Sequence, residues 1–158
     1  ELFERVTLEA FQSGLSWLII LRKRDNFRAA FDGFDVERVA RYTERDVERL
    51  MADQGIVRNR LKIDATISNA QVVARLADDG VDLGELLWSF APQDRITRDR
   101  PADLSQVAPV TPESTAMAKE LKRRGFRFVG PTTAYALMQA TGMVDDHVAA
   151  CWVPRLSE

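Results

Sequence analysis

One short segment carries residue types that bind phosphate. Residues 122–135 read KRRGFRFVGPTTAY, and Gly130 directly precedes Pro131, a residue type favoured at the first position of a helix. A glycine leaves backbone N–H groups uncovered, and these amides form an anion site together with the positive end of the helix dipole. Three arginines would add positive charge around it: Arg123, Arg124 and Arg127. The spacing fits a helix-hairpin-helix, which holds the DNA backbone without reading its sequence. It fits an ordinary helix corner with solvated basic residues equally well, so both interpretations stay open.

A possible metal-binding pair lies near the C-terminus. His147 and Cys151 are the only histidine and the only cysteine of the chain, and four residues separate them along the sequence. On a helix this spacing would place both side chains on one face. A closed structural zinc site needs four ligands, and the chain offers two, so the pair by itself is weak evidence for a metal.

Glu9 and Trp17 each have an ordinary explanation from the local pattern. Glu9 follows Leu2 by seven residues, which places it at the edge of an apolar helical face, where a carboxylate commonly reaches solvent. Trp17 stands in an apolar run, where a tryptophan is usually part of the core. Its electron-rich ring would alternatively attract a cation.

The elements that must position these residues are helical. Apolar residues recur at helical intervals almost throughout, and nothing resembles alternating strands or internal repeats. The sequence predicts an all-α protein. The expected helices cover residues 2–10, 18–31, 44–54, 58–78, 112–124 and 131–141, with a short apolar piece at 83–90.

Residues typical of helix ends mark several boundaries between these helices. Thr43 with Asp46 three residues later predicts an N-terminal cap, and Gly55 predicts the end of that helix. Gly142 predicts the end of the last helix. Residues 91–110 contain three prolines and scattered charges, so we expect a loop there.

Composition limits the class of protein. The 158 residues include 46% hydrophobic residues, with 22 Lys and Arg against 24 Asp and Glu, as in one ordinary globular domain. A single cysteine excludes an internal disulfide framework and suits a reducing compartment. The net charge of −2 gives no global attraction to DNA, so DNA binding must depend on local patches and on the hairpin amides.

Four segments together resemble one known family. They are residues 8–17 (LEAFQSGLSW), 59–70, 122–135 and 144–151 (VDDHVAAC), and the likeness runs almost end to end. The chain resembles the DNA-3-methyladenine glycosylase I family, constitutive bacterial alkylation-repair enzymes of the helix-hairpin-helix superfamily. The resemblance implies one helical domain over residues 1–158 with the hairpin motif at about 112–142.

The resemblance also implies an activity and its partners. The enzyme would flip a damaged nucleotide out of alkylated double-stranded DNA, hydrolyse the N-glycosidic bond and release free 3-methyladenine. It would act as a monomer in the bacterial cytoplasm without a catalytic cofactor. Two rival classes are a non-enzymatic helix-hairpin-helix DNA-binding module and a helical scaffold that binds no nucleic acid.

Residue roles follow from the same resemblance. Glu9 would accept hydrogen bonds from the flipped adenine and take part in catalysis, and the methylated base would stack on Trp17. His147 and Cys151 would hold a structural zinc ion. Since its other ligands come from an N-terminal segment in the family, we expect such a segment to be missing here. The residues expected to contact the DNA backbone are Arg127, Val129, Gly130, Thr132 and Thr133.

Asp145 has two open interpretations. In the wider superfamily a Val-Asp-x-x-Val-like segment after the hairpin supplies an aspartate that stabilises the sugar cation, and residues 144–148 (VDDHV) have that pattern. Enzymes of the 3-methyladenine family often carry asparagine there. An aspartate soon after Gly142 would equally serve as the N-cap of a helix.

Several further positions receive no functional role. Asn59, Lys62 and Asn69 match the family pattern, but their residue types indicate no particular task. Two further basic clusters are interpreted as solvated helix ends: Arg22, Lys23, Arg24 and Arg28, and Arg58, Arg60 and Lys62.

Overall fold

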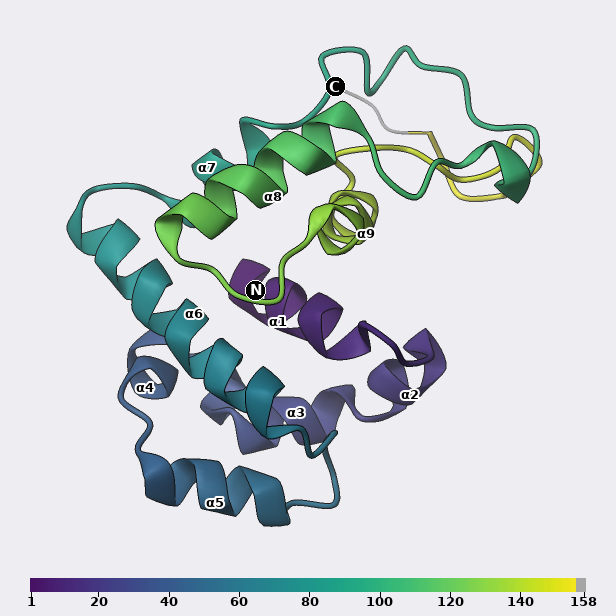
Figure 1. The fold of residues 1–158 in the computed structure, drawn as a ribbon. Coiled ribbons are helices and arrows are strands. Elements are labelled where there is room, and N and C mark those ends of the chain that lie inside the picture. Colours follow the sequence, from purple (N-terminus) through teal and green to yellow (C-terminus); the bar gives the residue numbers. More distant parts are fainter. Residues whose placement is uncertain (156–158) are drawn as a thin grey trace.

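The computed structural model describes residues 1–155, which form α-helices joined by turns, with no strand in that range (Figure 1). The helices are α1 (Leu2–Gln12), α2 (Trp17–Arg22), α3 (Arg24–Ala30), α4 (Val36–Ala40), α5 (Glu44–Ala52), α6 (Arg60–Asp78), α7 (Leu83–Trp88), α8 (Pro112–Arg124) and α9 (Pro131–Thr141). Two short 3₁₀ helices, η1 (Asp32–Phe34) and η2 (Leu104–Gln106), interrupt the connections. The predicted all-α class is confirmed. None of the described helices is long and apolar enough to cross a membrane.

Helices α1 and α6 link the two halves of the molecule, one formed by α2–α5 and the other by α7–α9. α6 packs against α4 and α5 on one side, and α1 contacts both α6 and α9. The hairpin of α8 and α9 lies on the opposite side of α1 from α3 and α5 (Figure 1). Helices α2–α5 and the hairpin are therefore connected through α1 and α6.

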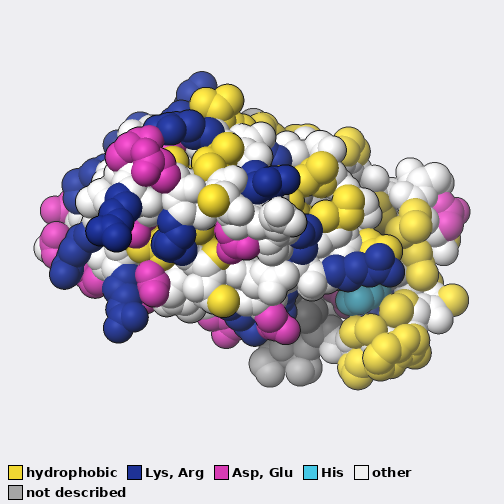
Figure 2. Space-filling model, turned by 90° about the horizontal axis from the view of Figure 1, so that it is seen from below, with side chains coloured by type: hydrophobic (Ala, Val, Ile, Leu, Met, Phe, Trp, Pro, Cys, Tyr) yellow, Lys and Arg dark blue, Asp and Glu magenta, His cyan; other side chains and the backbone are white. Residues whose placement is uncertain are grey.

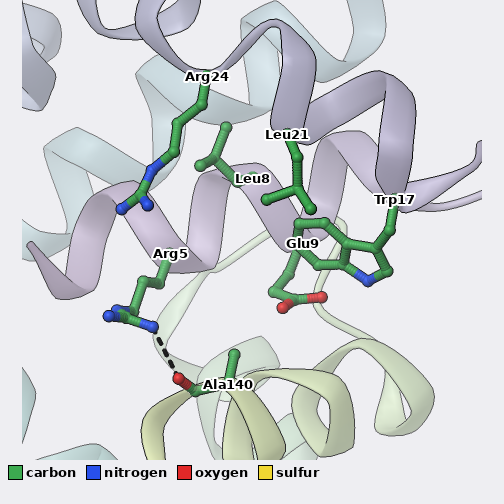
Figure 3. Close-up of a pocket in the computed structure, with 7 residues that line it drawn as sticks. All are labelled: Arg5, Leu8, Glu9, Trp17, Leu21, Arg24 and Ala140. Carbon is green, nitrogen blue, oxygen red and sulfur yellow. Dashed lines mark hydrogen bonds between the residues drawn. The ribbon is translucent and has the colours of Figure 1, made fainter.

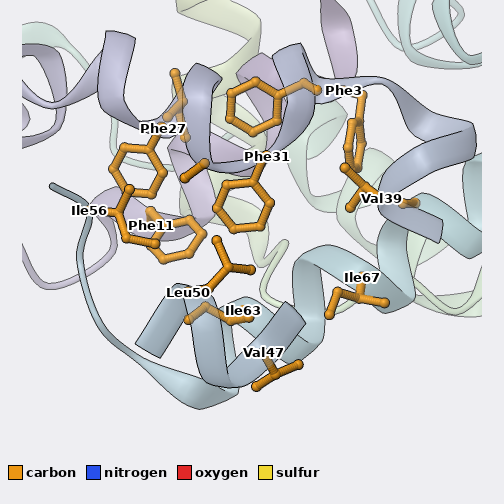
Figure 4. Packing of buried hydrophobic residues seen from close by; sticks show 14 of the residues in the cluster. Phe3, Phe11, Phe27, Phe31, Val39, Val47, Leu50, Ile56, Ile63 and Ile67 are labelled. Atoms are coloured by element: carbon orange, nitrogen blue, oxygen red, sulfur yellow. The ribbon is translucent and has the colours of Figure 1, made fainter. Parts of the chain in front are cut away.

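Each half has its own core. The first is rich in aromatic rings, among them those of Phe11, Phe27 and Phe31 (Figure 4). The Phe11 and Phe27 centroids are 4.8 Å apart, and Phe31 stacks on Phe34. The second lies between α8 and α9 and is lined mainly by aliphatic side chains and methionines, such as Met138. α6 contributes buried residues to both cores, so its position is determined from two sides.

Local signals predicted several helix ends correctly. The N–H of Thr43 donates to the carboxylate of Asp46 at 2.9 Å, as expected for a capping box. Gly125 and Gly142 end α8 and α9 with φ of 102° and 76°, values that side chains other than glycine rarely adopt.

Other boundaries differ from the predictions. The expected helix at 18–31 is broken at Lys23, whose ammonium donates to the carbonyls of Gln54 and Gly55. α4 was not predicted; the carboxylate of Asp35 caps it by accepting the Arg38 N–H at 2.9 Å. α5 ends at Ala52, before the expected boundary, and Gly55 instead lies in the following turn.

The loop expected at residues 91–110 contains only η2 and runs beside the C-terminal segment (Figure 1). The Ala149 N–H donates to the Pro101 carbonyl at 2.8 Å and joins the two. The chain after α9 thus packs on an irregular loop and forms no helix in the described residues.

Candidate functional site

A pocket opens between α1, α2 and the C-terminal end of α9. It is lined by Arg5, Leu8, Glu9, Trp17, Leu21, Arg24 and Ala140 (Figure 3). Its volume is about 130 Å³. For comparison, an apolar cavity of about 150 Å³ admits benzene. The pocket is slightly smaller than that cavity and is open on one side, so it encloses part of an aromatic ring.

Glu9 is the polar centre of this pocket. Its side chain is 2% exposed, and among residues 1–155 its Oε2 atom has no hydrogen-bond partner. Burial raises the pKa of the Glu9 carboxyl to about 7, against the opposing effect of the Arg5 charge. A ligand that brings N–H donors or positive charge would supply the missing partner and favour the carboxylate form.

Trp17 forms one wall of the pocket next to Glu9 (Figure 3). It is the first residue of α2, whose start is capped by the Ser16 hydroxyl, the acceptor of the Leu18 N–H at 3.2 Å. Trp17 is half-buried and packs only partly on the aromatic core. Trp17 therefore packs on the core and also lines the pocket, and its role in binding a base stays a prediction.

Arg5 joins the pocket to the hairpin. Its Nη1 donates to the carbonyl of Ala140 at 2.6 Å, which ties α1 to the last turn of α9 (Figure 3). The C-terminal carbonyls of a helix lack intrahelical partners, so a guanidinium there is a favourable cap. The pocket wall and the hairpin consequently share one hydrogen bond.

Most members of the two basic clusters are engaged in contacts, contrary to the expectation of solvated helix ends. Arg24 and Arg28 both bind the buried carboxylate of Glu4 at 2.8 Å. Arg60 pairs with Glu44 at 2.7 Å, while Lys62 is buried. These side chains support the fold, and their partners are distant in sequence, which is why local spacing did not reveal them.

The hairpin between α8 and α9 presents an open backbone. A side chain placed at Gly130 would meet no atom within 4 Å, and α9 has no side-chain cap. The first-turn amides of α9, at Thr132 and Thr133, therefore have no capping side chain in front of them. A shallow depression lies here, lined by Lys122, Phe126, Arg127, Phe128, Val129 and Gly130. Three of the residues predicted to contact DNA, Arg127, Val129 and Gly130, line this depression, and their contact with DNA stays a prediction.

The charges around the hairpin differ from the expectation. Arg123 and Arg124 both bind Glu120 at 2.7 Å, so this carboxylate partly compensates them. Lys122 and Arg127 are the basic residues that line the depression. Figure 2 shows the molecule from the side of α5, and on that face basic side chains are interspersed with acidic ones.

Asp145 is held by an ion pair. Its Oδ2 accepts from Arg100 Nε at 2.9 Å, and Arg100 also donates to the carbonyls of Val153 and Pro154. Both side chains of the pair are less than a tenth exposed. No helix follows Asp145 in the described residues, so the prediction of a helix cap is wrong. Asp145 does not line the pocket around Glu9.

His147 and Cys151 lie close together, but not on a helix as predicted. A turn in which the Cys151 N–H donates to the Val148 carbonyl brings Cys151 Sγ within 3.6 Å of His147 Nδ1. Two ligands of a tetrahedral zinc ion are separated by about 3.5 Å, given Zn–S and Zn–N distances of about 2.3 and 2.0 Å. Within residues 1–155, no third His, Cys, Asp or Glu joins the pair to form a metal-binding cluster.

Comparisons with known proteins agree with this arrangement. The family model described as methyladenine glycosylase matches residues 1–154. DNA-3-methyladenine glycosylase 1 of Escherichia coli K12 is 45% identical over 152 residues, which are 96% of this chain and 80% of that protein. A crystal structure of 3-methyladenine DNA glycosylase I superposes with a TM-score of 0.91 at 46% identity, covering 96% of this chain and 82% of the other.

A second solved structure contains a ligand. It is a variant of 3-methyladenine DNA glycosylase I in complex with 3-methyladenine, with a TM-score of 0.88 at 33% identity, and the alignment covers 96% of this chain and 81% of that one. The match to the family model over almost the whole length, together with the identity to the curated relative, shows that this chain belongs to the methyladenine glycosylase family.

Proposed function

We propose that the protein is a DNA-3-methyladenine glycosylase of base-excision repair, which hydrolyses the bond between 3-methyladenine and deoxyribose in alkylated DNA. The observation that carries this proposal is the buried Glu9 carboxyl, whose Oε2 lacks a partner within residues 1–155, beside the Trp17 ring. The relatives named above supply the substrate class.

Recognition would depend on the charge of the lesion. The target nucleotide must leave the base stack, at a cost of a few kcal/mol that is smaller for a damaged base. Methylation at N3 makes the base cationic in the nucleotide, and an aromatic face such as that of Trp17 attracts cations. The Glu9 carboxylate would accept a hydrogen bond from the exocyclic amine. An unmodified adenine lacks the charge and gains less from both contacts.

The same charge assists the chemistry. The glycosidic C–N bond breaks with both electrons going to the base, so the cationic purine departs as neutral 3-methyladenine. Water then adds to the anomeric carbon and loses a proton to solvent. Because the leaving group needs no protonation, the protein contributes mainly a pocket shaped for the lesion and electrostatic support for the sugar cation.

The hairpin would anchor the DNA backbone. Uncapped amides at a helix N-terminus bind phosphate, and such contacts position DNA without specifying its sequence. Gly130 has φ of −83°, so an aspartate there is compatible with the backbone, and it would act as an N-cap. Gly130→Asp should therefore preserve stability yet weaken duplex binding by about 3 kcal/mol, since it covers the amides and repels phosphate. Unchanged duplex affinity in a folded variant would remove the anchor from the hairpin.

We assign Asp145 a structural role in this reaction. The guanidinium of Arg100 already neutralises its carboxylate, and Asp145 lies outside the pocket-lining residues. A carboxylate that stabilises a sugar cation would need to face the reacting atoms. We propose that the Asp145 pair fixes the C-terminal segment, and that Glu9 is the carboxylate which contacts the substrate.

Zinc is a separate proposal. The spacing of His147 and Cys151 suits two ligands of a tetrahedral ion, and two further ligands would have to come from outside the described residues. When bound, zinc would supply structural cross-linking and no chemistry. Metal analysis of the purified natural protein and of its Cys151→Ala variant tests this, because equal zinc content in both would exclude the pair as ligands.

The decisive experiment is a base-release assay on methylated duplex DNA. We expect wild-type protein to release free 3-methyladenine and Glu9→Gln to release less. Duplex binding without any release would support the non-enzymatic DNA-binding module instead. Absence of both binding and release would support the helical scaffold.

A further inference from the structure

Two polar side chains on α6 are buried without lining the pocket. Lys62 is 8% exposed and Asn69 is 2% exposed. Seven residues separate them, which places both on the same face of the helix, about two turns apart. Their partners lie in the two regions that the proposed function uses.

Lys62 holds the connection between α1 and α2. Its Nζ donates to the carbonyl of Phe11 at 2.9 Å and to that of Ser13 at 2.6 Å, at the end of α1. These carbonyls have no partner inside the helix, and a cation is favoured beside them. Glu9 lies in the last turn of α1, and Trp17 begins α2. The separation of these two pocket residues therefore depends on the turn that Lys62 holds.

Asn69 holds the hairpin in the same manner. Its Nδ2 donates to the Arg127 carbonyl at 3.0 Å, and its Oδ1 accepts the Arg127 N–H at 2.8 Å. Both ends of the side-chain amide thus bind the backbone of one loop residue. Gly130 follows three residues later, so this pair of bonds sets where the open amides lie relative to α6.

We propose that Lys62 and Asn69 are positioning residues, which fix the base pocket and the DNA-binding hairpin relative to each other from a single helix, α6. Lys62 orients the base pocket, and Asn69 orients the DNA anchor. A flipped base must reach the pocket while its phosphates rest on the hairpin, so the distance between the two sites has to be constant. α6 supplies that distance. This inference rests on the proposed function for its ligands.

The test separates the two sites by binding. Free 3-methyladenine probes the pocket, and an undamaged duplex probes the anchor; neither measurement requires catalysis. Lys62→Met should weaken affinity for the free base by about tenfold and leave duplex affinity nearly unchanged. Asn69→Leu should weaken duplex affinity by about tenfold and leave base affinity nearly unchanged.

The chain offers a matched control at Thr66, which lies between the two residues on α6. Thr66 is 2% exposed, and its hydroxyl donates to the Lys62 carbonyl of the same helix at 2.9 Å. Thr66→Val removes a buried hydrogen bond without touching either site. We expect it to change the melting temperature while both affinities stay as in the wild type.

Conservative variants show whether a loss of affinity comes from the missing hydrogen bonds or from misfolding. Lys62→Arg keeps a charged donor and should restore most of the base affinity that Lys62→Met loses. Asn69→Asp keeps the acceptor for the Arg127 N–H but loses the donor, so its duplex affinity should fall between wild type and Asn69→Leu.

The outcomes distinguish this inference from the proposed function. If Lys62→Met and Asn69→Leu each weaken both affinities, in step with the stability loss that Thr66→Val also causes, the positioning roles are overturned. Selective losses in a protein that releases no base would support the positioning roles and contradict the proposed glycosylase activity.

Discussion

The pocket and the C-terminal junction each bury a carboxylate, with opposite electrostatic arrangements. Among residues 1–155, Glu9 has a carboxylate oxygen without a hydrogen-bond partner, and burial raises its pKa to about 7. Asp145 is bound by Arg100, which is itself tied to two backbone carbonyls. A charge that is fully paired stabilises the fold but is poorly available to a ligand, whereas an unpaired one is costly until a ligand arrives.

Whether a buried carboxylate is paired indicates whether it has a structural or a functional role. Strongly shifted pKa values in a cleft are typical of functional sites, and Glu9 combines such a shift with an opening to solvent. Asp145 has a sequence pattern that suggested catalysis, yet its surroundings resemble an internal cross-link. The surroundings of each carboxylate, rather than its local motif, are therefore our reason for proposing Glu9 as the functional one.

The largest expected effect comes from breaking the paired carboxylate. Asp145→Ala leaves the Arg100 guanidinium buried without its charge partner, so we expect the free energy of unfolding to fall by about 3–5 kcal/mol. Denaturation in urea measures this. A loss below about 1 kcal/mol would mean that the ion pair contributes little, as exposed pairs do.

A second variant at Asp145 tests whether this carboxylate also contributes to the reaction. Asp145→Asn retains an acceptor for Arg100, and single-turnover base release in the folded variant should match the wild type. A rate loss of about 100-fold or more would return Asp145 to a catalytic role, since removal of a preorganised electrostatic group has that magnitude.

Removing the unpaired carboxylate of Glu9 should raise the free energy of unfolding, whereas removing the paired carboxylate of Asp145 should lower it. The folded-state pKa of Glu9, about 7, exceeds its ordinary value of 4.5, so the folded protein binds more protons between these pH values. Stability therefore falls as pH rises through that window. At pH 8, Glu9→Gln should be more stable than wild type by about 3 kcal/mol, and the difference should vanish below pH 4.5. Equal stability at pH 8 would show that the carboxylate is already compensated.

Trp17→Ala tests whether the base stacks on the Trp17 ring in the wall of the pocket. Stacking of a base on an aromatic ring is worth about 1–3 kcal/mol, so affinity for free 3-methyladenine should fall by that amount. Because Trp17 is only half-buried, the stability loss should stay below the roughly 3–5 kcal/mol of a fully buried tryptophan. Calorimetric titration and thermal melting of the same variant compare the two losses, and a dominant stability loss would favour the core interpretation.

The smallest expected effect is a pH profile. The ionised fraction of a carboxyl with a pKa of about 7 rises roughly tenfold between pH 6 and pH 8, and affinity for the cationic lesion in DNA should rise with it. Glu9→Gln should lack this dependence, which separates it from general effects of pH on DNA binding. A profile that is identical in the variant and the wild type would assign the titration to another group.

The sequence by itself determined the helical class, the two helices of the hairpin and several helix ends. These depend on signals within a few residues, such as the Thr43 and Asp46 cap or the glycines after α8 and α9. The choice of Glu9 and Trp17 came from the family resemblance, since spacing alone left each with an ordinary alternative.

Only the tertiary structure decided which polar groups meet. Asp145 lies 45 residues from Arg100, and the Asn69 amide binds a backbone 58 residues away. The turn that joins His147 to Cys151 likewise replaced the expected helix, since this segment packs on the loop at Pro101. Hydrogen bonds at helix ends and turns are read from neighbouring residues, but the partner of a buried charge depends on how the helices pack, and helical periodicity contains no information about that.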